Sequence, residues 1–229
     1  MTALSPLGKA HNHLPFKQYG EMEILYRDEA IVVVNKPGGL LAVPGRGPEK
    51  QDCVTARLRR LFPAMIPQPA AHRLDVYTSG LMVCAMTAEA HRTLSLQFAG
   101  REIRKRYIAL VSGIIAGDSG EIRLHFRLDP NNRPLQIHDQ EYGKLGITHW
   151  RKISVEQQNT RLEFTPLTGR THQLRLHAAH PLGLGAPIVG DSLYGTGRDG
   201  DKMMLHATFL QFRHPLTREI KEFNSPPPF

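Results

Sequence analysis

Short strand-like segments recur along the chain from residue 22 to residue 223, separated by Gly, Pro and polar residues. These segments are rich in β-branched, aromatic and aliphatic residues, as strands are. They are residues 22–28, 30–37, 80–86, 106–113, 121–126, 147–155, 160–167, 205–212 and 219–223. The helical stretches between them come at irregular intervals, which argues against a doubly wound sheet. We therefore predict an α+β fold with a mixed, largely antiparallel sheet and flanking helices.

Three stretches have helical spacing: residues 52–63, 87–100 and 169–180. In the first, Asp52 is the expected N-cap and Pro63 ends the helix. In the second, Thr87 is the expected N-cap and Gly100 suits the C-terminal exit. A polar loop is expected over residues 129–146.

The chain of 229 residues has no internal repeat or linker, and it is long enough to bury a core without disulfides. Residues 1–20 lack periodicity and are expected to form a loose arm, followed by one domain over residues 21–229. Cys84 lies in an apolar run and is expected in the core. There is neither a secretory signal nor an apolar run of about 18 residues, so we expect a cytoplasmic protein that does not span a membrane.

The net charge is +8, which favours a polyanionic partner such as nucleic acid. A solvated surface accounts for the charge equally well. The run "GREIRKRY" adds a local signal, because Arg104 and Lys105 lead directly into Tyr107 at the start of an apolar strand. Cations beside an aromatic side chain suit a site that grips a nucleic-acid backbone and stacks on a base. Such a run is more often a solvated face.

Motifs for nucleotide, metal or redox chemistry are absent. Gly45 and Gly47 lack the further residues of a phosphate loop, although Arg46 between them could meet a phosphate. His172, His177 and His180 are close in sequence, but no acid joins them, and we expect them to be structural. The two cysteines are far apart. We predict no cofactor and no metal.

An acid lies at the mouth of an apolar strand in "AHRLDVYTSG", residues 71–80. A lone Asp in a loop is usually a turn former. Here Asp75 precedes the segment "GLMVCAM", which is too apolar for a surface strand. A carboxylate in a dry cleft needs a cation beside it, and an arginine binds both carboxylate oxygens. Arg175 in "GRTHQLR" is a candidate, but sequence alone leaves the two as unrelated polar residues by default.

Three segments together resemble the signatures of RluA-type pseudouridine synthases: "HRLDVYTSG", "RKRYIALV" and "GRTHQLRLH". The segments "VVNKPGGLLAVPGRG" and "PIVGDSLYG" also fit, so that the resemblance covers about residues 22–228. It is nearest to the short branch that lacks an S4-type domain, as "PNNRPLQ" indicates. Members of this branch modify uridine in large-subunit rRNA and in the tRNA anticodon stem-loop.

The resemblance implies a role for individual residues. Asp75 corresponds to the catalytic aspartate, Tyr107 to the tyrosine that stacks on the target base, and Arg175 to the arginine that pairs with the aspartate. Arg73 corresponds to the arginine that enters the RNA stack when the uridine leaves. Leu174 or Leu176 is expected to line the pocket. Further RNA contacts are expected from Arg46, Arg104, Lys105 and Arg133.

The implied enzyme is an isomerase with a central cleft, a monomer that acts on RNA without a small-molecule cofactor. It breaks the C1′–N1 bond of uridine, turns the uracil and rejoins it through C5. Asp75 either forms an ester with the sugar or takes a proton from C2′, and Tyr107 holds the detached uracil and assists proton removal from C5. Two alternatives are a non-catalytic RNA-binding or ribosome-associated protein and an Asp-dependent hydrolase, which would need a second carboxylate. Sequence does not choose the RNA or the uridine.

Two positions depart from the family pattern. Ala186 stands where many relatives have His, and Arg218 stands where many have a turn glycine. Both lie outside the three signature segments, so they bear on loop detail rather than on the chemistry.

Overall fold

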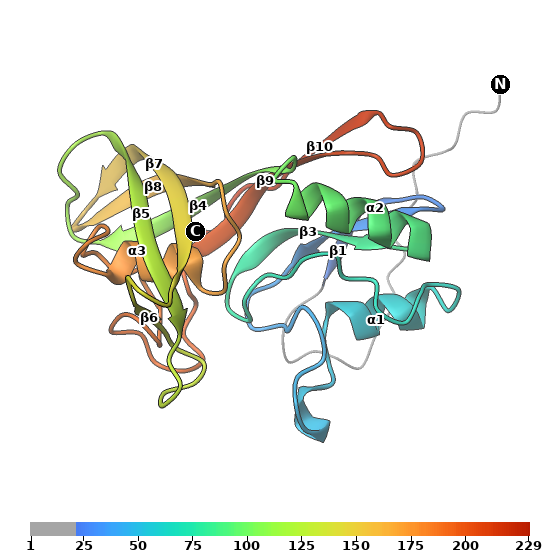
Figure 1. The fold of residues 1–229 in the computed structure, drawn as a ribbon, viewed down its shortest axis with the longest axis horizontal. Helices are drawn as coiled ribbons and strands as arrows, with labels where there is room; N and C mark the ends of the chain where they lie inside the picture. Colours follow the sequence, from blue (N-terminus) through green and yellow to red (C-terminus); the bar gives the residue numbers. More distant parts are fainter. Residues whose placement is uncertain (1–21) are drawn as a thin grey trace.

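The computed structural model describes residues 22–229, and the arm expected over residues 1–20 lies outside them (Figure 1). The strands are β1 (Glu23–Arg27), β2 (Ile31–Lys36), β3 (Ser79–Ala85), β4 (Arg104–Ser112), β5 (Ser119–Leu128), β6 (Gln136–His138), β7 (Lys144–Glu156), β8 (Asn159–Pro166), β9 (Leu205–Arg213) and β10 (Ile220–Asn224). The helices are α1 (Val54–Leu61), α2 (Ala88–Ala99), α3 (Gln173–Ala179) and the short 3-10 helix η2 (Pro48–Lys50).

The strands form one mixed sheet in the order β1-β2-β3-β9-β4-β8-β7-β5-β6, and β10 pairs with β9. All pairings are antiparallel except that of β3 with β9, which is parallel and short. The predicted α+β class with a largely antiparallel sheet is therefore confirmed. In Figure 1, strands β1 to β3 with α1 and α2 make one half of the molecule, strands β5 to β8 with α3 make the other, and β4 and β9 connect them.

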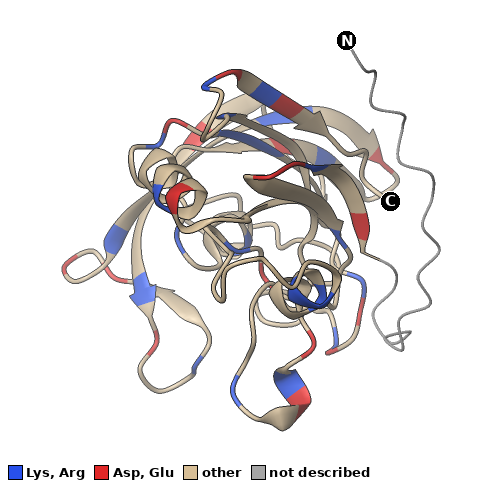
Figure 2. Ribbon diagram, turned by 90° about the vertical axis from the view of Figure 1, so that its right-hand side faces the viewer, with Lys and Arg blue, Asp and Glu red and all other residues tan. Residues whose placement is uncertain are grey.

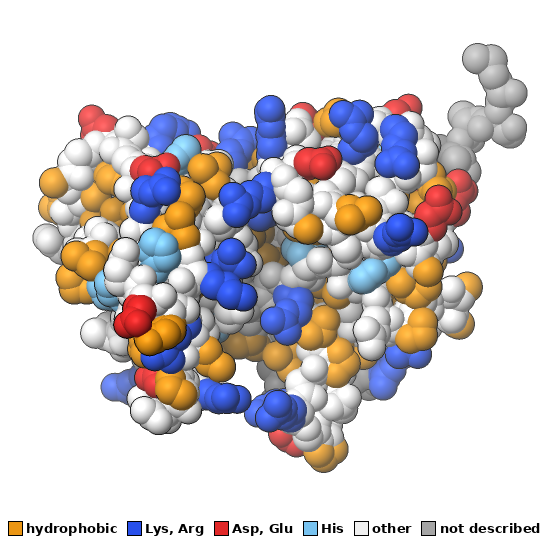
Figure 3. All heavy atoms as spheres, viewed as in Figure 1, with side chains coloured by type: hydrophobic (Ala, Val, Ile, Leu, Met, Phe, Trp, Pro, Cys, Tyr) orange, Lys and Arg blue, Asp and Glu red, His pale blue; other side chains and the backbone are white. Residues whose placement is uncertain are grey.

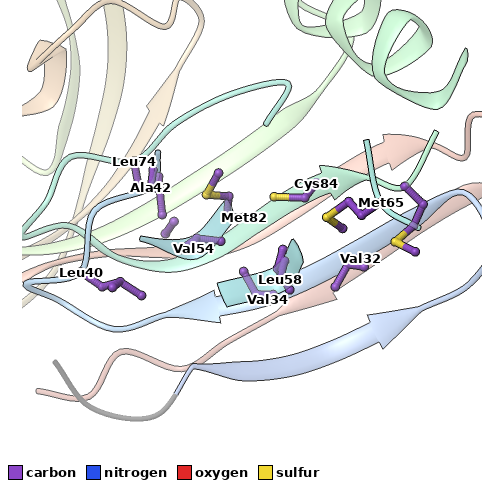
Figure 4. Close-up of a cluster of buried hydrophobic side chains, with 12 residues drawn as sticks. Val32, Val34, Leu40, Ala42, Val54, Leu58, Met65, Leu74, Met82 and Cys84 are labelled. Atoms are coloured by element: carbon purple, nitrogen blue, oxygen red, sulfur yellow. The ribbon is translucent and has the colours of Figure 1, made fainter. Parts of the chain in front are cut away.

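Strands β2 and β3 are buried on both faces, which explains why their sequences are continuously apolar. Alternate side chains of a strand point to opposite faces. Val32, Val34, Met82 and Cys84 pack with Leu58 of α1 (Figure 4). The residues between them, including Val33 and Val83, pack with Leu94 of α2 on the other face. Cys84 is thus a core residue, as predicted.

The second half has its own core, which reaches the first half through β4. Ala109 and Val111 of β4 pack with Leu162 and Phe164 of β8 and with Leu174 of α3. Tyr107 packs against this cluster and also against the cluster of Val32 and Leu58, so it marks the boundary between the halves.

Of the two predicted N-caps, one is confirmed and one is wrong. Thr87 is the N-cap of α2, and its side chain accepts a hydrogen bond from Ala90 N. The N-cap of α1 is Cys53 rather than Asp52, and its Sγ accepts from Ala56 N. The Asp52 carboxylate instead binds the Arg57 guanidinium through hydrogen bonds of 2.8 and 2.7 Å. Because Arg57 binds the Asp52 carboxylate, that carboxylate does not cap the helix.

The expected loop over residues 129–146 contains the short strand β6, which pairs with β5, and its last three residues already belong to β7. Three residues without an apolar run are too short for a periodic signal. Among the described helices, none is long and apolar enough to cross a membrane.

Candidate active site

A large cleft lies between the two halves of the molecule. Its walls bring together residues 35–39, 71–79, 166–175 and 199–203, which are far apart in sequence. Figure 3 shows Lys and Arg side chains gathered along the hollow between the halves. All three segments singled out from the sequence thus contribute to one site.

Asp75 lies in the loop before β3, and the backbone around it is fixed on several sides. Thr78 N donates to Asp75 O at 3.1 Å, closing a turn. The neighbouring carbonyl of Val76 accepts from Gly39 N and from Lys36 Nζ, both at 2.9 Å. The Asp75 side chain is 26% exposed, so it is open to the cleft. A rigid loop with an accessible carboxylate suits a reacting group.

Gly80 allows β3 to approach β9 directly after this loop. Its φ is 110°, a backbone conformation that residues other than glycine rarely adopt. A Cβ on this residue would lie 2.3 Å from Ala207 O. Gly80 pairs with Lys36 of β2 on one side and with Ala207 of β9 on the other, so the loop of Asp75 ends at the junction of three strands.

Arg175 binds two aspartates, one through hydrogen bonds and the other through charge. Its Nε and Nη2 donate to Asp191 at 2.8 and 2.6 Å. Its Nη1 lies 3.7 Å from Asp75 Oδ2. The predicted Asp75–Arg175 pair is therefore present, but the carboxylate that Arg175 binds through both oxygens belongs to Asp191, which the sequence reasoning missed.

The buried ion pair is electrostatically consistent. Burial opposes ionisation of Asp191, but the hydrogen bonds and charge of Arg175 and the N–H groups of Leu193 and Tyr194 hold its pKa below the usual value. Burial also works against charge on Arg175, yet Asp191 and Asp75 together raise its pKa. Arg175 is 2% exposed, and it remains a permanent cation facing Asp75.

Tyr107 lines the cleft from β4, close enough to Asp75 to feel its charge. The pairing of β4 with β9 shifts between Arg106 and Tyr107 and passes over Thr208. Such bulges often redirect a side chain beside an active site. Burial, and then the charge of Asp75, raise the pKa of Tyr107, so the free protein holds it as a neutral phenol.

Lys36 is a buried lysine in contact with the Asp75 loop that sequence reasoning did not identify. Its Nζ donates to the carbonyls of Pro37, Leu40 and Val76 at 3.0, 2.7 and 2.9 Å. Three acceptors match the three hydrogens of an ammonium group. Burial lowers the pKa of Lys36 to about 7, while the charge of Asp75 acts to raise it. A lysine at the end of the apolar segment "AIVVVNKP" was the available signal.

The basic residues expected to contact RNA fall into two groups. Arg73 and Lys105 line the cleft. Arg46, Arg104 and Arg133 are exposed but lie outside its lining, so contacts from them stay a prediction. Besides Lys36, the cleft is lined by four further basic residues that the sequence analysis did not assign to RNA binding: Lys50, Arg101, Arg170 and Lys202. Leu174 lines it, whereas Leu176 packs with Phe126 in the core.

The clustered histidines have separate surroundings. His172 Nδ1 lies 2.9 Å from the Tyr194 hydroxyl, His177 packs edge-on against Phe126, and His180 lies beside His138. Within residues 22–229, no three His, Cys, Asp or Glu side chains form a group that could hold a metal ion.

The chain is similar to known proteins over most of its length. The family model described as RNA pseudouridylate synthase matches residues 30–180. A protein of Haemophilus ducreyi, named dual-specificity RNA pseudouridine synthase RluA, is 41% identical over 224 residues, covering 95% of this chain and 97% of its own. The protein of the same name from Escherichia coli K12 is 40% identical over 210 residues, covering 90% and 93%. The solved structure of human RNA pseudouridylate synthase domain containing 1 aligns with a TM-score of 0.72 at 29% identity, covering 91% and 84%.

Proposed function

The chain belongs to the RNA pseudouridylate synthase family, and from this premise we propose that Asp75, Arg175 and Tyr107 are the catalytic residues of its cleft. The protein is an RNA pseudouridine synthase, an isomerase. The observation that carries the assignment is the contact of Asp75 with Arg175 across the cleft, with 3.7 Å between Oδ2 and Nη1. We assign the catalytic domain to residues 21–229.

Asp75 is proposed to act on the ribose of the target uridine. Cleavage of the C1′–N1 bond builds positive charge on the sugar, which a carboxylate stabilises or attacks. Attack at C1′ and proton removal from C2′ both need an ionised Asp75 and a free oxygen. Asp191 takes the Nε hydrogen and one Nη2 hydrogen of Arg175, and the guanidinium atom nearest to Asp75 is Nη1. Arg175 thus places a positive charge 3.7 Å from Asp75 and leaves both oxygens of the acid without a hydrogen bond from the guanidinium.

Tyr107 is proposed to stack on the uracil, and Arg73 to replace the base in the RNA. A uridine inside folded RNA must be flipped out before Asp75 can reach its sugar. Arg73 suits the vacated position, because it is exposed at the cleft and has no ion-pair partner among residues 22–229. Base stacking on an aromatic side chain is sequence-tolerant and contributes about 1–3 kcal/mol.

The substrate is proposed to be uridine in large-subunit rRNA and in the tRNA anticodon stem-loop. The name of the relatives, dual-specificity RNA pseudouridine synthase, supports more than one RNA target. Lys and Arg side chains along the cleft would bind phosphates, and Figure 2 shows charges of both signs on strands, helices and loops elsewhere. We also propose that the protein acts in the cytoplasm as a monomer, since one chain forms the whole cleft.

Tritium release from RNA labelled at C5 of uridine tests the assignment, because reattachment through C5 expels that hydrogen. Wild-type protein should release tritium from labelled rRNA and tRNA. Asp75→Asn should release none while still binding both RNAs, since the amide keeps the shape but loses the charge. A comparable rate in Asp75→Asn would overturn the assignment. Release from neither RNA by folded wild type would exclude the proposed substrates.

A further inference from the structure

His172 holds an unusual backbone conformation at the cleft wall. Its φ is 55° and its ψ 17°, the left-handed region, directly before α3. For a residue with a Cβ this region costs about 1–2 kcal/mol. The side chain does not cap α3, so helix capping does not explain it. Strain of this kind tends to persist where a side chain must be aimed at a functional site.

A chain of two hydrogen bonds fixes the His172 ring. Gln136 N lies 2.7 Å from the Tyr194 hydroxyl, and a backbone N–H can only donate. The hydroxyl oxygen therefore accepts there, and it lies 2.9 Å from His172 Nδ1. Among residues 22–229 the Tyr194 hydrogen has no other acceptor, so it goes to Nδ1. The His172 proton is then on Nε2.

The resulting imidazole is a neutral donor. Burial lowers the pKa of His172; the charge of Asp75 raises it, that of Arg175 lowers it, and the net direction is downward. His172 lines the same cleft as Asp75 and Tyr107. Its Nε2 has no hydrogen-bond partner among the described residues, and a half-buried donor without a partner is available to a ligand.

We propose that His172 Nε2–H donates a hydrogen bond to a carbonyl oxygen of the flipped uracil, with Tyr194 as a positioning residue that fixes the tautomer. The inference rests on the proposed uridine site. When the C1′–N1 bond breaks, its electron pair stays with N1 and spreads onto O2 and O4. A donor already aimed at one of these oxygens binds more tightly as the negative charge develops.

The alternative partner of His172 is a phosphate of the RNA backbone. That reading is disfavoured because phosphates attract cations, and the cleft already offers Arg73, Lys105 and Arg170. The two readings differ in their kinetics. A base contact that strengthens during cleavage changes the rate of the bound complex, whereas a phosphate contact changes RNA affinity.

Single-turnover tritium release and RNA binding in His172→Ala test the proposal. The rate should fall about 10²-fold, the effect of removing one such donor. RNA affinity should change less than about threefold, because phosphate contacts supply most of it. His172→Gln, which restores an N–H donor, should recover at least about a tenth of the wild-type rate, and Tyr194→Phe should lose about tenfold. His149→Ala, at an exposed position on β7, should match wild type in both measurements.

Target RNA with 2-thiouridine or 4-thiouridine identifies the oxygen, because sulfur is a weaker acceptor. One of the two substitutions should slow wild type more than it slows His172→Ala. Equal effects of both substitutions on the two proteins, or a pure loss of RNA affinity in His172→Ala, would overturn the proposal. If His172→Ala does not fold, His172→Gln and the thio-substituted RNAs still decide. Activity persisting in Asp75→Asn would instead refute the assignment of the site itself.

Discussion

Arg175 is anchored to Asp191 by hydrogen bonds of 2.8 and 2.6 Å, and through this anchor it presents Nη1 to Asp75 at 3.7 Å. Asp191 is fully buried, whereas the Asp75 side chain is 26% exposed. The two carboxylates therefore differ in role: Asp191 holds the guanidinium in place, and Asp75 stays accessible from the cleft. This arrangement predicts that the buried acid matters for catalysis although it never touches RNA.

Asp191→Asn should destabilise the protein and slow catalysis together. Removing one partner of a buried ion pair leaves an uncompensated charge and costs about 3–5 kcal/mol. A displaced guanidinium should also lower the single-turnover rate by about 10²-fold. Urea unfolding and tritium release measure the two effects. Arg175→Ala should cripple catalysis as well, because Asp75 loses its cation.

A surface ion pair provides the control for Asp191. Glu156, 38% exposed, binds Arg161. Glu156→Gln should cost no more than about 1 kcal/mol and leave the rate unchanged. Equal stability losses in the two variants, or a full catalytic rate in Asp191→Asn, would contradict the anchoring role.

Substitutions of Tyr107 should distinguish stacking by its ring from proton transfer by its hydroxyl. Measured in the Asp75→Asn background, Tyr107→Ala should weaken RNA binding by about 1–3 kcal/mol, whereas Tyr107→Phe keeps the ring and should bind normally. In otherwise wild-type protein, Tyr107→Phe should slow the single-turnover rate by about 10²-fold if the hydroxyl assists proton removal from C5. Tyr142→Ala, an exposed aromatic on the 139–143 turn, serves as control. Binding equally weak in the Phe and Ala variants would rule out stacking.

The parts of the site that could be predicted from sequence are those with a local signal. Asp75 stands out because an acid precedes an apolar strand, and Tyr107 because cations run into an aromatic residue. Asp191 has no such signal: choosing the partner of Arg175 among the carboxylates of the chain requires the three-dimensional fold. Lys36 was hidden for a related reason, since its three carbonyl acceptors come from a loop conformation that sequence does not specify.

In the fold, too, the elements with a local sequence signal were predicted and those without one were not. Periodicity and composition found the long strands and the buried character of β3, because burial imposes a pattern on many residues at once. β6 was missed because three residues show no period. The cap of α1 was misplaced because Asp52 had two possible uses, and the pairing with Arg57 prevailed over the cap.

Acid should unfold the protein partly through buried histidines. Burial and the charge of His180 lower the pKa of His177 to about 4, and burial lowers that of His206 to about 4. Between pH 6.5 and 4 these histidines bind protons in the unfolded chain but stay neutral in the folded chain. The free energy of unfolding therefore keeps its full value above pH 6.5 and falls as the pH drops toward 4. For His177, the difference between 6.5 and about 4 corresponds to about 3 kcal/mol.

His177→Leu isolates this effect, because neither ring nitrogen has a hydrogen-bond partner among the described residues. The variant should equal or exceed wild type in stability at pH 7. Below pH 6.5 its free energy of unfolding should fall less steeply, by up to about 1.4 kcal/mol per pH unit. Urea unfolding across pH 4.5 to 7 measures this, with His149→Leu as the exposed control. Parallel curves for His177→Leu and wild type would show that His177 is not kept neutral by burial.

The backbone at Arg218 should be strained, and a glycine at this position should relieve the strain. Arg218 lies in the turn between β9 and β10 with a φ of 64°, a conformation that favours glycine. A residue with a side chain destabilises the folded state by about 1–2 kcal/mol in this region. Glycine avoids this strain, but its greater backbone entropy in the unfolded chain opposes folding by about 0.5–1 kcal/mol. Arg218→Gly should therefore raise the free energy of unfolding by up to about 1 kcal/mol. The turn's hydrogen bonds, from Arg218 N to His214 O and from Arg213 Nη1 to Arg218 O, use only the backbone of residue 218 and should persist.

Arg218→Ala is the matched control, because it removes the same charged side chain but keeps the Cβ that creates the strain. It should show no comparable gain in urea unfolding, and both variants should retain the wild-type rate of tritium release, since residue 218 does not line the cleft. Equal stabilisation by Ala and Gly would assign the effect to charge instead. With a net charge of +8, relief of repulsion is the competing cause, and raising the salt concentration would diminish that contribution but not the gain that comes from backbone strain.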